Sequence, residues 1–230
     1  MDPSVTQEIQ IPSEVPVMTL SAAVLFPQAM MPLYIFEPRY RAMLKEVLAH
    51  DRIFVVAALD ESSETARELE TPRAVAGIGM IRACQTNADG SSNLILQGLA
   101  RVHVEAIVSE NPFRRARIRQ VFSEPGGSFD LMDTIQPDIL SLIQAQINLG
   151  APIPNEVLQF LSRVREPENV LDLAIATVCP QSDFKQELLE TRGILPRYER
   201  FQSFLKEELE RLKLERQLRG DLGDDAISQN

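Results

Sequence analysis

Residues 26–36 form the segment of this 230-residue chain with the clearest capacity for binding. They read Phe-Pro-Gln-Ala-Met-Met-Pro-Leu-Tyr-Ile-Phe, an apolar run with two prolines and two adjacent methionines. Methionine surfaces adapt to varied partners, and aromatic, Met and Arg side chains are frequent interface anchors. We therefore predict a protein- or peptide-binding site with apolar anchors and a charged rim, formed by Met30, Met31, Tyr34, Phe36, Glu37, Arg39 and Arg41.

The alternative interpretation of residues 26–36 is structural. It places more than half of the apolar side chains in the core of a β-rich domain. The order of the residues does not show which side chains face solvent, so both interpretations stay open.

A second candidate site is basic. Arg115, Arg117 and Arg119 alternate with apolar residues, and Arg114 lies beside them. Arginines on one face of a strand suit a carboxylate or phosphate partner. The alternative, which we favour, is a solvated edge strand whose charges prevent pairing with other sheets.

The sequence offers little for catalysis. It lacks the phosphate-binding pattern G-x-x-x-x-G-K-[ST], the dinucleotide-binding pattern G-x-G-x-x-G and the nucleophile pattern G-x-S-x-G. The only histidines, His50 and His103, have no Cys or His at ligand spacing. We therefore predict no catalytic residue, no metal and no cofactor, although a serine–lysine dyad and a carboxylate pair remain open.

The net charge of the chain disfavours some classes of binding partner. The net charge is -10, which disfavours a nucleic-acid binder and docking on anionic lipid. Residues 123–230 carry 11 Lys/Arg and 19 Asp/Glu, a net of -8, so most of the acidity lies in the second half. Two distant cysteines, Cys84 and Cys179, predict reduced core residues and a cytoplasmic protein. Residues 1–14 carry no basic or apolar run, and no stretch approaches about 18 apolar residues, so we expect neither a secretory signal nor a membrane span.

The first half has the pattern of strands. Apolar or alternating runs predict strands at 15–20, 53–59, 74–83, 93–97, 101–108 and 115–122, the last with Ala116, Ile118 and Phe122 on its apolar face. Gly77 and Gly79 suggest a bulge or a close backbone approach. Helical spacing after Pro38 predicts one helix over 38–48, and the acidic residues 60–70 predict a mobile loop.

The second half has the pattern of helices. Residues 123–128, Ser-Glu-Pro-Gly-Gly-Ser, predict a linker, after which the apolar period changes from two to about 3.6. We expect helices over 129–219, with caps at Asn155 and Asp183 and a long last helix from near Pro196. The predicted organisation is a β-rich domain at 1–122, the linker, a helical subdomain at 129–219 and a flexible acidic tail at 220–230, an α+β chain.

Residues 32–44 read Pro-Leu-Tyr-Ile-Phe-Glu-Pro-Arg-Tyr-Arg-Ala-Met-Leu, and weaker motifs follow at 77–81, 96–102 and 111–117. In this order these motifs resemble the N-terminal domain family of Lon proteases, most closely its stand-alone bacterial members, and the segment at 32–44 is the most specific of them. The resemblance covers roughly residues 12–215. One departure is Gln28, where the family commonly carries glycine.

The resemblance implies a PUA-like pseudo-barrel of about six strands, followed by a helical bundle with a long C-terminal helix. In full-length Lon proteases this region precedes the ATPase and serine–lysine peptidase domains and helps to recognise protein substrates. We expect the chain to end where those domains would begin. The resemblance therefore implies a non-catalytic protein that binds other proteins or unfolded, apolar peptide segments, as a substrate-recognition or adaptor module in proteolysis.

Two further functions stay open. PUA-like folds elsewhere bind small ligands or RNA, and the arginines at 115, 117 and 119 would serve such a partner. A cryptic hydrolase is the third possibility. The identity of the partner and the oligomeric state do not follow from the sequence.

Overall fold

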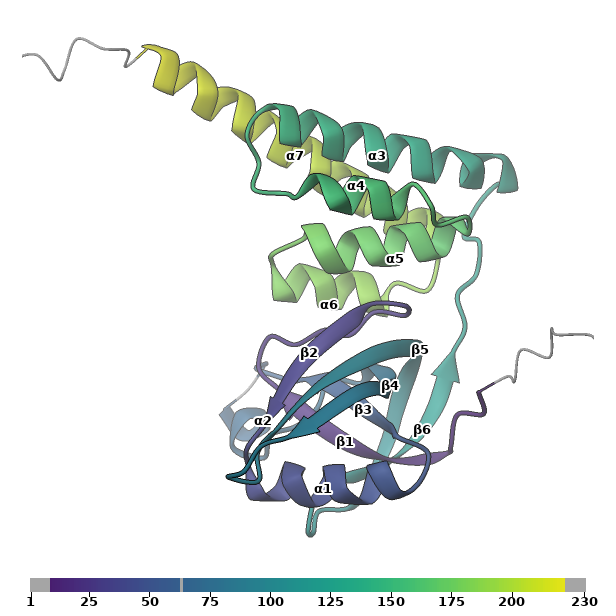
Figure 1. The fold of residues 1–230 in the computed structure, drawn as a ribbon. Helices are drawn as coiled ribbons and strands as arrows, with labels where there is room; N and C mark the ends of the chain where they lie inside the picture. The colour runs from purple at the N-terminus through teal and green to yellow at the C-terminus, as the bar shows by residue number, and fades with distance from the viewer. Residues whose placement is uncertain (1–8, 63, 222–230) are drawn as a thin grey trace, which may run out of the picture. The chain divides into compact units, whose positions relative to one another are not determined.

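The computed structural model describes residues 9–62 and 64–221 (Figure 1). Within them the chain divides into two compact units. The first comprises residues 9–25 and 30–121, and the second comprises residues 26–29 and 122–221. The first unit is mostly β-sheet and the second is helical, so the predicted α+β class is confirmed.

The first unit is a β-barrel of five strands with a sixth strand outside the ring. Its strands are β1 Glu14–Leu20, β2 Met30–Ile35, β3 Ile53–Ala58, β4 Val75–Thr86, β5 Ser92–Ser109 and β6 Arg115–Val121, and its helices are α1 Pro38–Ala49 and α2 Glu64–Glu68. The strands follow the order β2-β5-β4-β3-β1-β6, with β1 and β3 parallel. An additional pairing of β5 with β6 closes five strands into a ring and leaves β2 outside it.

Alternation along β3 explains why its apolar run is unbroken. Val55 and its like-facing neighbours pack in a cluster with Val15 and Val17 of β1. Phe54 and Val56 face the other way and pack in a second cluster with Met43 and Leu44 of α1. Figure 1 shows α1 lying against the strands of this unit. Both faces of β3 are therefore buried, as the sequence predicted.

The bulge predicted at the glycines is confirmed. The register between β4 and β5 shifts between Ile78 and Gly79. A Cβ atom on Gly77 would lie 2.0 Å from the backbone oxygen of Leu25, so only glycine fits there. Gln28, where the resembling family commonly has glycine, adopts a φ of 63°, the left-handed conformation that glycine enters at least cost.

Other expectations for the first unit were wrong. The strands predicted at 93–97 and 101–108 are one strand, β5, and residues 60–70 contain α2. Strand β6 pairs on both sides, with β1 and β5, so it is not an edge strand. Phe122 follows β6 and is 67% exposed, unlike Ala116 and Ile118, because the strand ends at Val121.

The second unit is a helical bundle. It contains the 3₁₀ turn η1 Phe129–Leu131 and the helices α3 Met132–Asn148, α4 Asn155–Leu161, α5 Pro167–Val178, α6 Ser182–Glu190 and α7 Ile194–Asp221. Figure 1 shows α3 alongside α7. Apolar residues at helical spacing fill the core, among them Ile135, Ile139 and Ile143 of α3 and Phe201 and Leu205 of α7.

The ends of these helices differ from the predictions. Neither Asn155 nor Asp183 caps a helix, because Pro154 and Gln181 hold the N-cap positions. Helix α7 begins at Ile194 and continues through Gly220 to Asp221, so the predicted tail at 220–230 starts too early. The rest of that tail, from 222 onward, lies outside the described residues.

Residues predicted as a linker are bonded into the second unit. The N–H of Glu124 donates to the oxygen of Arg192 at 3.2 Å, and the N–H of Ile194 donates to the oxygen of Glu124 at 2.8 Å. Leu195 donates in the same way to the oxygen of Pro125 at 3.0 Å. This segment therefore runs along the start of α7.

One buried cation links the parts of the second unit. The Arg197 side chain is fully buried, and its Nη1 lies 2.5 Å from Oδ1 of Asp172, which is also fully buried. The same guanidinium donates to Ser123 Oγ at 2.9 Å, to Glu168 Oε1 at 3.4 Å and to the backbone oxygen of Thr191 at 3.1 Å. Arg197 thus connects α7 to α5, to the end of α6 and to the segment after β6.

Asp172→Ala is expected to destabilise the second unit by about 3–5 kcal/mol, because it leaves the Arg197 guanidinium buried without its closest carboxylate. Denaturant unfolding followed by far-ultraviolet circular dichroism measures this. The control is Glu187→Ala, which breaks the exposed pair with Arg200 and is expected to cost at most about 1 kcal/mol. Equal losses in the two variants would contradict the central role of Arg197.

Candidate binding surface

The candidate apolar residues lie on β2 or, for Phe36, directly after its last residue, and alternation along this segment divides them. Met30, Tyr34 and Phe36 are 58%, 54% and 59% exposed, whereas Ile35 is buried. Met31 is half-buried and packs, together with Leu33, against the apolar cluster that contains the buried side chains of α1. The structural interpretation therefore holds for the inward side of the strand, and the binding interpretation stays a prediction for the outward side.

The outward side of the strand forms a compact apolar surface, which we call the β2 face: Met30, Pro32, Tyr34 and Phe36. Tyr34 and Phe36 are two residues apart and stack with ring centroids 5.7 Å apart and planes inclined by 25°. Stacking restricts both rings before any partner arrives, which lowers the entropy lost on binding. An exposed, ordered aromatic pair of this kind suits the role of an interface anchor.

A hollow of about 450 Å³ adjoins the β2 face. Three neighbouring strands line it with residues 32–34 of β2, 93–95 of β5 and 83–85 of β4. The register places Tyr34 beside Asn93, and Asn93 beside Gln85. The hollow therefore combines apolar walls with two amides that can bond to a backbone.

Sequence reasoning missed the part of this hollow formed by β4 and β5. Its residues come from strands distant along the chain, and only the pairing register brings them together. The signal available in the sequence was the spacing of two between Met30, Pro32, Tyr34 and Phe36, which matches one face of a strand.

The open edge of β2 is poorly suited to adding another strand. Within the described residues β2 pairs only with β5, so its other edge has no sheet partner. Pro32 has no N–H to donate, and proline on an edge strand discourages pairing with another chain. A partner would therefore engage the side chains of the β2 face rather than its backbone edge.

The charges predicted at the rim are held in place by neighbours. Arg39 Nε donates to Glu37 at 3.0 Å, and the Arg39 guanidinium also donates to Glu70. Its central carbon lies 4.6 Å from the ring centroid of Tyr40. Hydrogen bonding from Arg39 lowers the pKa of the Glu70 carboxyl below its usual range. Arg41 belongs to α1, and its guanidinium reaches the turn between β4 and β5, where a Cβ on Gly90 would meet it.

The arginine stripe on β6 is matched by acids. Arg115 lies 2.6 Å from Glu46, Arg117 lies 3.6 Å from Glu14, and Arg119 lies 3.2 Å from Glu105. Each guanidinium thus has a carboxylate beside it. This pairing lowers the positive potential that an anionic partner would need.

Two side chains that catalysis could use, Lys185 and Cys179, are held in the fold of the second unit. Lys185 donates to the backbone oxygen of Ala176 at 2.8 Å, and burial lowers the pKa of its amine. Burial raises the pKa of the Cys179 thiol, which disfavours a reactive thiolate. Across residues 9–62 and 64–221, no three His, Cys, Asp or Glu side chains gather as metal ligands. No helix in the same ranges is long and apolar enough to span a membrane.

Comparison with known proteins points to one family. The sequence profile described as the ATP-dependent protease La (LON) substrate-binding domain matches residues 14–207. Among curated relatives, the Lon protease of Desulfosudis oleivorans is 25% identical over 223 residues, covering 96% of this chain and 27% of the relative. Lon protease 2 of Thermus thermophilus is 26% identical over 213 residues, covering 90% and 26%. The chain spans about a quarter of the length of these relatives.

Solved structures show the same fold. The N-terminal domain of the Lon protease from the Mycobacterium avium complex aligns with a TM-score of 0.65 at 16% identity, covering 86% of this chain and 98% of that one. A Lon N-terminal domain protein from Xanthomonas campestris aligns with a TM-score of 0.56 at 18% identity, covering 84% and 98%.

Glu70→Gln is expected to lower the free energy of unfolding at neutral pH by at most about 1 kcal/mol, because the Arg39–Glu70 pair is partly exposed. A lowered pKa means that the stabilisation is present above the pKa of the unfolded chain and lost as the pH falls through that of the folded chain. The difference between wild type and variant should therefore disappear in acid. Denaturant midpoints measured across this range test the expectation, and a constant difference would contradict it.

Proposed function

Because the chain belongs to the family of Lon substrate-binding domains, we propose that it binds exposed apolar segments of other proteins through the β2 face, without catalysing a reaction. The observation that carries this proposal is the group of Met30, Tyr34 and Phe36, each more than half exposed and adjoining a hollow. Contiguous exposed apolar surface on a soluble fold marks interaction sites.

The side chains of the β2 face are suited to binding a partner that is unfolded or extended. An aromatic pair and a methionine offer apolar contact without demanding one shape of partner. Asn93 and Gln85 line the adjoining hollow, where their amides can bond to the backbone of any sequence. Such a surface selects for exposed apolar side chains and accepts many sequences, as recognition of damaged or unfolded proteins requires.

We extend the proposal to a role in proteolysis because the chain belongs to this family. Segments delivered to a protease must first be recognised as exposed, and a chain with this fold would supply that step as a recognition or adaptor module. The ion-paired arginines of β6 give the nucleic-acid alternative no added support.

Purified protein is expected neither to cleave casein nor to hydrolyse ATP, and either activity would overturn the non-catalytic part of the proposal.

The double variant Tyr34→Ala, Phe36→Ala is expected to weaken binding about tenfold or more, because truncating interface anchors commonly costs at least about 2 kcal/mol. The probe is fluorescein-labelled, reduced and carboxymethylated lactalbumin, which is permanently unfolded, and fluorescence anisotropy measures its dissociation constant.

The matched control is Phe160→Ala, which removes a 51% exposed phenylalanine on α4 and should leave binding unchanged. Circular dichroism establishes that each variant is folded. If the folded double variant bound the probe as tightly as wild type, the β2 face would not be the binding site.

A further inference from the structure

A β-bulge in β4 places Arg82 beside the β2 face. The register between β4 and β5 shifts between Ile81 and Ala83, so Arg82 is the extra residue of the bulge. In a regular strand successive side chains point to opposite faces, yet Arg82 and Ala83 are both exposed and Ile81 is buried. A bulge re-aims a side chain in this way. Because Ala83 lines the hollow that adjoins the β2 face, Arg82 lies at the border of that hollow.

Contacts across the sheet connect Arg82 to the β2 face. Its Nε donates to Oε1 of Gln97 at 2.6 Å, and its Nη1 lies 3.4 Å from the sulfur of Met80. Gln97 is the β5 partner of Met30, which belongs to the β2 face, and the β4 partner of Gln97 is Met80. One row of side chains across three strands therefore leads from the exposed Met30 to a guanidinium.

The charge of Arg82 is not balanced by an acid. In the part of the chain that the structure describes, its guanidinium contacts a neutral amide and a thioether and pairs with no carboxylate. Asp51, which precedes β3, instead accepts a hydrogen bond from the N–H of Ile53 at 3.1 Å. Residues 32–34, 83–85 and 93–95, which line the hollow, include no charged side chain. An exposed arginine with neutral neighbours keeps its capacity to bind a carboxylate.

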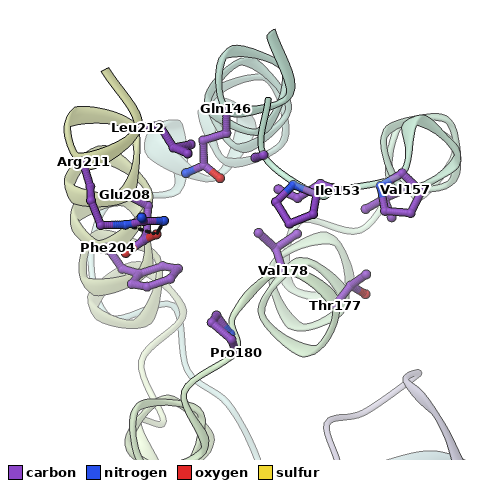
Figure 2. Close-up of a pocket in the computed structure, with 13 residues that line it drawn as sticks. Gln146, Ile153, Val157, Thr177, Val178, Pro180, Phe204, Glu208, Arg211 and Leu212 are labelled. Atoms are coloured by element: carbon purple, nitrogen blue, oxygen red, sulfur yellow. Dashed lines mark hydrogen bonds and ion pairs between the residues drawn. The ribbon is translucent and has the colours of Figure 1, made fainter. Parts of the chain in front are cut away.

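A hollow in the second unit has the opposite arrangement. It measures about 320 Å³ and lies between α7, the end of α5 and the loop between α3 and α4 (Figure 2). Its arginine, Arg211, lies 2.8 Å from Glu208 and also bonds to Glu215. Figure 2 shows the Arg211 side chain directed at Glu208. The charge of Arg211 is thus balanced within its own helix, so this arginine provides a matched control for Arg82.

From these contacts we infer that the β2 face prefers extended apolar segments that carry an aspartate or a glutamate, whose carboxylate binds Arg82. This inference rests on the proposed function of the β2 face and names the class of segment that the face selects. Nη2 of Arg82 makes no hydrogen bond within the described residues, so it can donate to a carboxylate while Nε keeps its bond to Gln97.

The sheet sets the spacing between the apolar and the acidic contact. Tyr34 and Met30 are about 13 Å apart along β2, at the rise per residue of a strand. Arg82 lies two strands away from β2, about 10 Å across the sheet. The diagonal is about 16 Å, which an extended chain spans with about five residues. We therefore expect the carboxylate about five positions from the apolar side chain that contacts Tyr34.

The test measures the binding of four fluorescein-labelled peptides to the full chain by anisotropy. Each has a leucine–phenylalanine pair, serine and glycine elsewhere, and blocked termini. Five positions from the pair, the first peptide has glutamate, the second glutamine and the third lysine, whereas the fourth has its glutamate directly beside the pair. We expect the first to bind about threefold more tightly than the second and fourth, and about fivefold or more tightly than the third.

The net charge of the chain makes this comparison discriminating. At a net charge of -10, non-specific attraction favours the lysine peptide. A preference for glutamate therefore reports a local contact. Equal binding of the glutamate and glutamine peptides, or tighter binding of the lysine peptide, would overturn the inference.

Substitutions of Arg82 locate the carboxylate. Arg82→Gln is expected to weaken binding of the first peptide about threefold and to leave the glutamine peptide unchanged, and Arg82→Glu should make the lysine peptide the tighter binder. The control, Arg211→Gln, removes the same charge beside the hollow of Figure 2 and should keep the preference for glutamate. Circular dichroism establishes that each variant is folded. If folded Arg82→Gln still prefers glutamate, Arg82 is not the source of the preference and the inference is wrong.

The proposed function and this inference fail in different measurements. The glutamine peptide reports apolar binding alone, and the double variant Tyr34→Ala, Phe36→Ala should weaken its binding about tenfold or more. If the glutamine peptide does not bind, or binds the double variant as tightly as wild type, the proposed function fails and the inference falls with it. If the double variant weakens binding but glutamate adds no affinity, only the inference is wrong.

Discussion

The helical unit depends on a cation buried where water cannot reach it. Arg197 has no exposed surface, so the energy of removing its charge from water must be recovered from Asp172 and the oxygens around it. Those oxygens belong to segments far apart in sequence, including Ser123 before the helices and Thr191 after α6. The guanidinium is satisfied only while these segments stay together, so separating any of them would leave part of a buried charge without its oxygens.

Local patterns in the sequence predicted most elements, and long-range pairing accounts for most of the differences. The apolar run at β3 and the spacing in α1 needed no tertiary information. The division of β5 into two strands at 93–97 and 101–108 was wrong, because β4 pairs with residues on both sides of the gap and with Gly98 and Ala100 inside it. Phe122 fitted the alternation of β6, but the strand ended one residue before it.

The candidate site also combines features that local sequence predicted with features that only the fold determines. The composition of residues 26–36 predicted a binding surface, and Tyr34 and Phe36 are exposed, as such a surface requires. Composition could not reveal that Met31 turns toward the core, because that depends on the phase of β2 relative to β5. The role of Glu70 in holding Arg39 was also beyond local reasoning, since the two residues are 31 positions apart.

The position of β2 outside the ring of five strands has an evolutionary consequence. Closure of the barrel rests on β5 pairing with β6, and β2 takes no part in it. Side chains on the outer side of β2 can therefore change without opening the barrel, while the inward Ile35 remains constrained by the core. Substitutions on this side can therefore accumulate while the closure of the scaffold is kept, so one barrel can carry outer surfaces of different chemistry.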